Sequence, residues 1–334
     1  MEDSIIIGTK VSLSRNINNY PFPHKLSQSE SQVIANKINN IILESEDLFQ
    51  EDFIAYNIKD ISQIEKNTLI ERNIISNKFS TNDIGSIIIN KDKTKYITVN
   101  DQEHIKINIY ENKFNVDEAF IIANKIDDIL ESKLDYAFDD KLGYLTSCPV
   151  NAGTGLKASI IVHLPILSLQ RRVDTYSNIA HKLGANIKGI CNEKSNILGN
   201  MYEISNQSVI GRSEKNIIES LKSLTKDIIT KERESRTLVK MEASIELEDE
   251  VYRALGILQN ARIITAYEAM KHLSNIKLGI EMDYIKDINI DKIINLMKGM
   301  KPALRLMSPM TGDSDTKRAD FLREEFTLAN RNKK

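Results

Sequence analysis

The sequence predicts an α+β domain built on a mainly antiparallel sheet flanked by helices, followed by a small helical domain. Over the first two-thirds of the 334 residues, short runs rich in Ile and Val alternate with amphipathic stretches of helical spacing. The strand-like runs lack the regular spacing of β–α–β units, which favours antiparallel pairing. From about Leu238 onward only helical patterns remain. We therefore expect one domain at residues 1–236 and a second at residues 237–334.

Seven segments have the composition of β-strands, because they are rich in Ile and Val and are bounded by Asn, Asp or Gly. These expected strands are Ser4–Gly8, Gly85–Asn90, Tyr96–Asn100, Ile105–Tyr110, Ala158–Leu164, Ile187–Ile190 and Met201–Asn206. The second and third are separated only by a short polar turn, so together they predict a hairpin.

Other segments carry apolar residues every three or four positions, as Val116, Phe120 and Ala123 do, and this spacing predicts helices. The expected helices are Ser29–Glu44, Ile61–Glu71, Val116–Leu134, Pro165–Leu183, Glu214–Glu234, Leu247–Asn260, Thr265–Gly279 and Asp291–Met300. We place the domain boundary inside the long charged helix that begins at Glu214.

Composition and charge narrow the class of protein. Hydrophobic residues make up 41% and charged residues 28%, as in soluble globular proteins, and the net charge of −2 gives no case for binding nucleic acid or an anionic membrane. No secretory leader is visible, and no uncharged run reaches the ~18 residues of a membrane span. Cys148 and Cys191 form no disulfide framework, and no Cys/His spacing predicts a metal site. We expect a cytoplasmic protein with reduced thiols.

Three stretches carry a more specific signal. They are Gly8–Asn16 with the nearby Asn19–His24, then Tyr136–Ser159, and finally Lys188–Gln207. Together they resemble the ATP:guanidino phosphotransferases, the family of arginine and creatine kinases, and above all its bacterial protein-arginine kinase branch. The Cys-Pro-x-Asn-x-Gly-Thr run at residues 148–154 is the most specific part. The resemblance extends from about Ile5 to Arg323 and includes a helical C-terminal domain.

The resemblance implies the phosphagen-kinase catalytic fold, which is glutamine-synthetase-like, with ATP lying on the antiparallel sheet. In the family several arginines hold the phosphates, paired carboxylates position the guanidinium, and a cysteine lies beside it. The physical reasons are general. Charge that develops on a transferred phosphoryl group needs preorganised cations, and a planar guanidinium pairs best with carboxylates.

The positions that match the family's phosphate-binding stretches hold few arginines in this sequence. They correspond to Lys10, Ser12, Arg15, Lys106, Lys157 and Lys188. Lysine keeps the positive charge but loses the planar fork of arginine, while serine loses the charge. Only 13 of the 45 basic residues are arginine, so coding bias accounts for some of these lysines. Each of them could instead be an ordinary solvated lysine.

The family's catalytic positions are altered as well. They correspond to Gln102, Glu103, Asn196, Glu193 and Cys148. The two key carboxylates have become the amides Gln102 and Asn196, which cannot accept a proton at neutral pH or neutralise a guanidinium. Asp101 and Glu103 flank Gln102, but neighbouring side chains in an extended chain point to opposite sides. Cys148 is retained, although a cysteine in this position could be simply a small buried residue.

A second motif lies near the end of the chain. The protein-arginine kinase branch has an Arg-Asp-x-x-Arg-Ala motif that recognises phosphoarginine, and residues 314–319 match it at Asp315, Arg318 and Ala319. The resemblance therefore implies a C-terminal domain for dimerisation and phosphoarginine recognition. The alternative is that Asp315 and Arg318 form an ordinary helix pair with i,i+3 spacing.

These substitutions lead to a first hypothesis and two rivals. The first is a pseudokinase that acts as a binding or regulatory protein, holds ATP or ADP with Mg²⁺ weakly and has no tightly bound metal. By analogy with the family its partners are proteins of stress response and quality control, such as a Clp-type unfoldase, its adaptor or a stress-gene repressor, and it forms a homodimer. The second is an active protein-arginine kinase that uses lysines for the phosphates and Glu103 or Asp101 for the guanidinium. The third is a structural dimer partner of an active paralogue.

Overall fold

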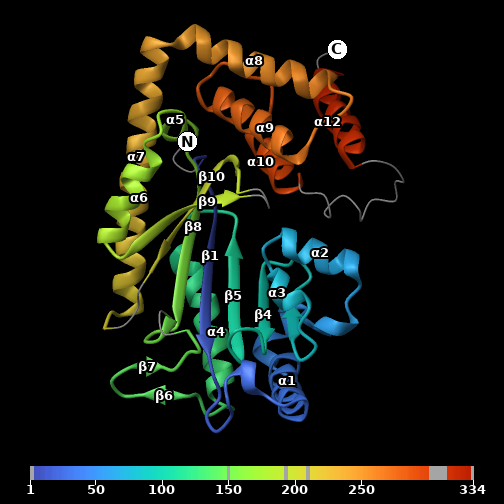
Figure 1. The fold of residues 1–334 in the computed structure, drawn as a ribbon, viewed down its shortest axis with the longest axis vertical. Helices are drawn as coiled ribbons and strands as arrows, with labels where there is room; N and C mark the ends of the chain where they lie inside the picture. The colour runs from blue at the N-terminus through green and yellow to red at the C-terminus, as the bar shows by residue number, and fades with distance from the viewer. Residues whose placement is uncertain (1–3, 149–150, 192–194, 208–210, 301–313, 332–334) are drawn as a thin grey trace.

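The computed structural model describes residues 4–148, 151–191, 195–207, 211–300 and 314–331, and its larger domain is built on an eight-stranded sheet (Figure 1). The strand order is β2-β3-β4-β5-β1-β8-β10-β9, and all neighbours pair antiparallel, which confirms the predicted sheet. The strands are β1 (Ile6–Arg15), β2 (Ile54–Asn57), β3 (Ser86–Ile89), β4 (Lys95–Val99), β5 (Ile105–Glu111), β8 (Leu156–His163), β9 (Ala185–Cys191) and β10 (Ile197–Asn206), with a separate hairpin of β6 (Phe138–Asp139) and β7 (Gly143–Tyr144).

Strand β1 continues well beyond the predicted Ser4–Gly8 and lies in the middle of the sheet. Its second half alternates polar and apolar residues, and Val11 and Leu13 are buried in the main core. Because successive side chains of a strand point to opposite faces, the intervening polar residues lie on the other face of the sheet. The alternation marks a strand with one apolar and one polar face.

Helices cover the apolar face. α1 (Gln28–Leu43), α4 (Val116–Glu131) and the long α7 (Glu214–Glu242) contribute to the core cluster that contains Val11 and Leu13 (Figure 1). α1 begins at a capping box in which Ser27 accepts from the backbone of Glu30 and the Glu30 carboxylate accepts from the backbone of Ser27. This layer leaves the opposite face of the central strands without a helical cover of its own.

The remaining helices of this domain are α2 (Gln63–Glu71), α3 (Asn77–Ser80), α5 (Pro165–Leu169) and α6 (Val173–Lys182). The single helix expected over Pro165–Leu183 is therefore two helices. They are separated at Arg171, whose φ of 56° is left-handed and cannot continue a right-handed helix.

The helical domain consists of α8 (Ser244–Asn260), α9 (Ala266–Glu281), α10 (Ile290–Lys298) and α12 (Ser314–Arg331), of which α12 was not predicted. Its core also contains Ile7, Leu198 and Met201 from the sheet domain, so the helices pack directly on one end of the sheet (Figure 1). α7 runs from the sheet into this domain and ends at Glu242. Within the described residues, no helix combines the length and apolarity that crossing a membrane requires.

Candidate active site

Three central strands bring lysines to the face of the sheet opposite the helical layer. Lys10, Ser12 and Ser14 of β1 share this face because they are two residues apart. Strand pairing sets Ser14 opposite Lys106 of β5 and Ser12 opposite Lys157 of β8. Since directly paired residues share a face, the three lysines lie together on a surface that we call the lysine face.

Burial and neighbouring lysines lower the pKa of Lys106. The pKa of Lys106 is lowered to about 8, first by burial and then by Lys10, with Lys157 adding to the effect and Asp101 opposing it. Burial also lowers the pKa of Lys10, although the negative charge of Glu203 opposes this. Positive charges held together in a partly buried place repel one another. Binding of a polyanion would neutralise them and is therefore favoured.

Glu203 of β10 is an acidic residue on this face that was not singled out from the sequence. It pairs directly with Lys188 of the edge strand β9, so the fourth expected cation lies at the sheet edge and is exposed. The approach of Glu203 to Lys10 depends on the pairing of strands that are far apart in the chain. No local pattern in the sequence could have revealed it.

Polar groups surround the lysines. The Ser12 hydroxyl donates to Asn108 Oδ1 at 2.8 Å, and both side chains are buried. Lys10 Nζ donates to the carbonyl of Asn73 at 3.2 Å and lies 5.4 Å from the centre of the Tyr96 ring. Ser12 is therefore held within the sheet, and its hydroxyl is already used by Asn108.

Arg15, the arginine retained among the expected phosphate contacts, lies on the other face of the sheet. Its Nη2 is 2.6 Å from Asp127 Oδ2 on α4, and both side chains are buried. Its guanidinium carbon lies 3.6 Å from the centre of the Tyr144 ring, and Nη1 donates to the carbonyl of Thr154. The structure thus separates Arg15 from the lysine face and places it in a buried ion pair.

The turn between β4 and β5 carries the expected catalytic positions. Gln102 is exposed, and its carbonyl accepts from the Ser147 hydroxyl at 2.7 Å. Glu103 is buried, and its Oε2 accepts from Asn16 Nδ2 at 2.6 Å and from the backbone N–H of Ser147 at 2.9 Å. The turn is therefore bonded to Ser147, the residue before Cys148. These bonds bring the predicted positions 102 and 103 close to the predicted cysteine.

The two acids that flank Gln102 differ in their surroundings. The Oε1 atom of Glu103 is buried and has no hydrogen-bond partner among the described residues. Asp101 is half-buried, and burial raises its pKa despite the nearby Lys106 and Lys78. His104 accepts from the backbone N–H of Ile17 and contacts the Pro21 carbonyl, so both of its ring nitrogens have backbone partners.

The other expected catalytic positions are Cys148, Asn196 and Glu193. Cys148 is half-buried, and its carbonyl accepts from the Thr146 hydroxyl at 2.7 Å. Asn196 is exposed just before β10, while Glu193 lies outside the described residues. Asp101 and Glu103 are therefore the acids that the described part of the chain holds close to Lys106.

The C-terminal motif lies on α12. The Arg318 side chain is fully buried, with Nη1 donating to the Ile264 carbonyl and to Asp315 and with Nε donating to the Met300 carbonyl. Asp315 and Arg318 thus form the i,i+3 pair that the sequence allowed. In this structure the Arg318 guanidinium is engaged by the helical domain itself.

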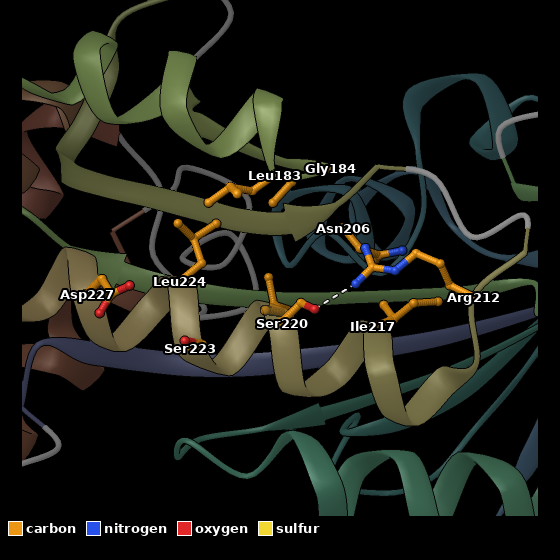
Figure 2. Close-up of a pocket in the computed structure, with 11 residues that line it drawn as sticks. Leu183, Gly184, Asn206, Arg212, Ile217, Ser220, Ser223, Leu224 and Asp227 are labelled. Atoms are coloured by element: carbon orange, nitrogen blue, oxygen red, sulfur yellow. Dashed lines mark hydrogen bonds between the residues drawn. The ribbon is translucent and has the colours of Figure 1, made fainter.

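A separate pocket of about 290 Å³ lies between α7 and the start of β9 (Figure 2). Arg212 reaches across its end and donates through Nη2 to the Ser220 hydroxyl at 2.6 Å. None of the site residues expected from the sequence lines this pocket. The chemistry implied by those residues therefore lies outside this pocket.

The lysine face gathers positive charge, and the turn beside it carries the neutral Gln102 between the acids Asp101 and Glu103. Lys10, Lys106 and Lys157 supply cations for a polyphosphate, while Gln102 offers an amide beside the segment of Cys148. Among the described residues, no group of three or more His, Cys, Asp or Glu side chains is arranged to hold a metal ion.

Comparison with known proteins agrees with this architecture. Residues 33–235 match the model of the ATP:guanido phosphotransferase C-terminal catalytic domain, and residues 244–334 match that of the protein-arginine kinase McsB C-terminal domain. A protein of Clostridium kluyveri named protein-arginine kinase is 38% identical over 97% of this chain and 95% of its own length. One of Caldanaerobacter subterraneus subsp. tengcongensis with the same name is 34% identical over 96% of each chain.

Solved structures show the same fold. A crystal structure of lombricine kinase is similar with a TM-score of 0.59 and 24% identity, over 72% of this chain and 67% of the other. The duplicated taurocyamine kinase from Schistosoma mansoni, with bound components of a transition state analog, gives a TM-score of 0.62 at 18% identity, over 80% of this chain and 41% of the other. At this level of identity the likeness concerns the fold.

Proposed function

This chain belongs to the ATP:guanido phosphotransferases, in the protein-arginine kinase branch, and we propose that it binds ATP or ADP on its lysine face but transfers phosphoryl groups to arginine only very weakly. The observation that carries the proposal is the turn at residues 101–103. It presents the neutral Gln102, while the Glu103 carboxylate is buried and accepts from Asn16 and Ser147. The chain then acts as a binding or regulatory protein.

Nucleotide binding follows from the charges of the lysine face. Lys10, Lys106 and Lys157 extend from adjacent strands, so a chain of phosphates lying across the sheet would meet all three. Mg²⁺ would arrive with the nucleotide, because it is commonly held by phosphates, waters and one or two carboxylates. Glu203 and Asp101 are the carboxylates near these lysines that would complement it.

Weak transfer follows from the neutral groups at the guanidinium positions. A guanidinium that attacks a phosphoryl group must be oriented and must lose a proton, and an amide neither attracts its charge nor accepts the proton. Gln102 and Asn196 occupy the positions of both carboxylates. By analogy with its branch, we propose that the chain works as a cytoplasmic homodimer with partners in protein quality control, such as a Clp-type unfoldase, its adaptor or a stress-gene repressor.

The second candidate is an active protein-arginine kinase. It is favoured by the names of the relatives, which are similar to this chain along most of its length. It is also favoured by Asp101, which lies near Lys106. Burial raises the pKa of Asp101, and a raised carboxylate pKa suits a residue that accepts a proton during the reaction. In this case Asp101 or Glu103 would take over from Gln102.

Titration with Mg-ADP and a transfer assay separate the candidates. We expect saturable Mg-ADP binding that Lys157→Ala weakens at least about tenfold, because a charged hydrogen bond to phosphate is lost. The matched control is Lys222→Ala, which removes a half-buried lysine that pairs with Asp117 away from the site. With Mg-ATP and an unfolded arginine-rich substrate, we expect little or no acid-labile phosphoarginine by mass spectrometry.

The kinase from Clostridium kluyveri is the positive control for that assay. Phosphoarginine formed at a comparable rate, and abolished by Asp101→Asn or Glu103→Gln, would establish the second candidate and overturn weak transfer. If ADP does not bind, or if Lys157→Ala and Lys222→Ala behave alike, the lysine face is not a nucleotide site.

Nucleotide affinity should also depend on pH. Lys106 has its pKa lowered to about 8, so it is charged at lower pH and loses its proton as the pH rises past that value. A bound phosphate favours the charged form, so affinity for ADP should fall about tenfold between about pH 7 and about pH 10. In Lys106→Arg the guanidinium stays protonated, and the fall should largely disappear. An equal fall in both proteins would assign the effect to another group.

A further inference from the structure

A large cavity lies between the two domains, away from the lysine face. It has a volume of about 780 Å³ and is lined by the start of β1, the loop after β5, α7, the end of α9 and the start of α10. This volume falls in the range of pockets that hold small organic ligands. Because both domains form its walls, a ligand bound there would contact both.

One wall of the cavity is cationic. Arg233, Arg236 and Lys240 come from α7 at spacings of three and four residues, which place them along one side of the helix. Lys113 adds a fourth positive charge from the loop after β5. The acids Glu281 and Asp291 also line the cavity, so the positive charges outnumber the negative ones.

Arg236 has an unused donor in this wall. Only 8% of the residue is exposed, with Nε 2.8 Å from Glu232 Oε1 and Nη1 2.9 Å from Glu281 Oε2. Its Nη2 atom is buried and has no hydrogen-bond partner among the described residues. A buried donor without a partner is unfavourable, and a guanidinium forms its strongest hydrogen bonds with phosphate or carboxylate oxygens.

Buried neighbours fix the Arg236 guanidinium in place. Glu281 also accepts from Lys277 Nζ at 2.6 Å, and the same Nζ donates to the carbonyl of Ser4, which lines the cavity. Although burial favours its neutral form, Lys277 and Arg236 hold the pKa of Glu281 below its ordinary value, so this carboxylate stays charged. The donor is thus preorganised.

The rest of the lining is largely apolar. Ile6 at the start of β1, the preceding Ile5, Ile280 from α9 and Ile294 from α10 contribute to it. An inorganic anion alone would leave this apolar surface in contact with water. The complementary ligand carries an anionic group for the arginines and an apolar portion for the isoleucines.

We propose that this cavity is a second ligand site, which binds a small organic phosphate between the sheet domain and the helical domain. The phosphate lies against the cationic wall formed by Arg233, Lys113 and the fixed Arg236 guanidinium, and the apolar part lies on the isoleucines. The site shares no residue with the lysine face and goes beyond the proposed function. Binding there would stabilise one arrangement of the two domains.

Phenyl phosphate is a suitable probe, because it joins a phosphate to an apolar ring, and inorganic phosphate and phenol are its two halves. In calorimetric titrations of the full chain we expect phenyl phosphate to bind at least about tenfold more tightly than inorganic phosphate, with no binding of phenol. The double variant Lys113→Ala/Arg233→Ala changes two exposed side chains and should weaken phenyl phosphate binding at least about tenfold.

Two further variants assign the site. Lys231→Ala, which removes an exposed lysine that does not line the cavity, should leave phenyl phosphate binding unchanged. Lys157→Ala should weaken Mg-ADP binding but not phenyl phosphate binding, so the two proposals can fail separately. If phenyl phosphate does not bind at millimolar concentration, or if Lys157→Ala abolishes its binding while Lys113→Ala/Arg233→Ala does not, the cavity is not a ligand site.

Discussion

The double variant Gln102→Glu/Asn196→Glu should phosphorylate arginine at least about a hundredfold faster than the unmodified chain. Removing one preorganised group that stabilises a transition state costs about 10²–10³ in rate, so restoring such groups should recover a factor of this size. Gains from groups that act together do not simply multiply. The lysine face stays unchanged in the variant, so the rise would come from the guanidinium side of the reaction.

Both substituted residues are exposed, so the new carboxylates require no repacking of the core. Gln102 is exposed on a turn whose carbonyl is bound by Ser147, next to Cys148. Glu103 lacks this freedom, because its side chain is buried and accepts from Asn16 and from the Ser147 backbone. A glutamate at position 102 would therefore be exposed beside the Cys148 segment, whereas the existing Glu103 supports the turn from inside.

The assay compares the double variant with each single variant and with Gln63→Glu, which adds an acid at the first residue of α2, outside the site. Phosphoarginine is quantified by mass spectrometry under conditions that preserve the acid-labile bond. If the double variant transfers no faster than Gln63→Glu, the amides are not what limits transfer. The substituted phosphate positions would then be the remaining explanation.

The fold was predictable where one type of pattern dominates a segment. The apolar face of α4 and the Ile-rich runs of β3 to β5 were found close to their true ends. The second half of β1 was missed, because its alternating polar residues were not recognised as the polar face of a strand. The break at Arg171 was missed as well, because a left-handed residue in a polar segment leaves no trace in apolar spacing.

The candidate site was predictable only through resemblance to the family. One residue assignment made from that resemblance, that of Arg15, could have been corrected from the sequence. Lys10 and Ser12 are an even number of residues apart, whereas Arg15 is an odd number away from both. In a continuous strand Arg15 must then point to the other face. The contribution of Glu203 could not be predicted, since it arises from the pairing of β9, β10 and β8 across long stretches of chain.

Replacing Arg15 tests this assignment of faces. Arg15→Met removes the guanidinium and leaves Asp127 buried, and among the described residues only the Tyr136 hydroxyl still donates to it. Breaking a buried ion pair by removing one partner typically costs about 3–5 kcal/mol, so we expect the free energy of unfolding in urea to fall by about 3 kcal/mol. Affinity for Mg-ADP, measured well below the new unfolding midpoint, should stay within about twofold of the original.

Lys157→Met should have the opposite pattern of effects to Arg15→Met. Lys157 is exposed on the lysine face, so its loss should leave the unfolding midpoint nearly unchanged and weaken Mg-ADP binding at least about tenfold. The two variants together distinguish an arginine that holds the sheet to α4 from a lysine that binds phosphate. If Arg15→Met loses ADP affinity and keeps its stability, the guanidinium reaches the nucleotide, and the lysine face is not the phosphate site.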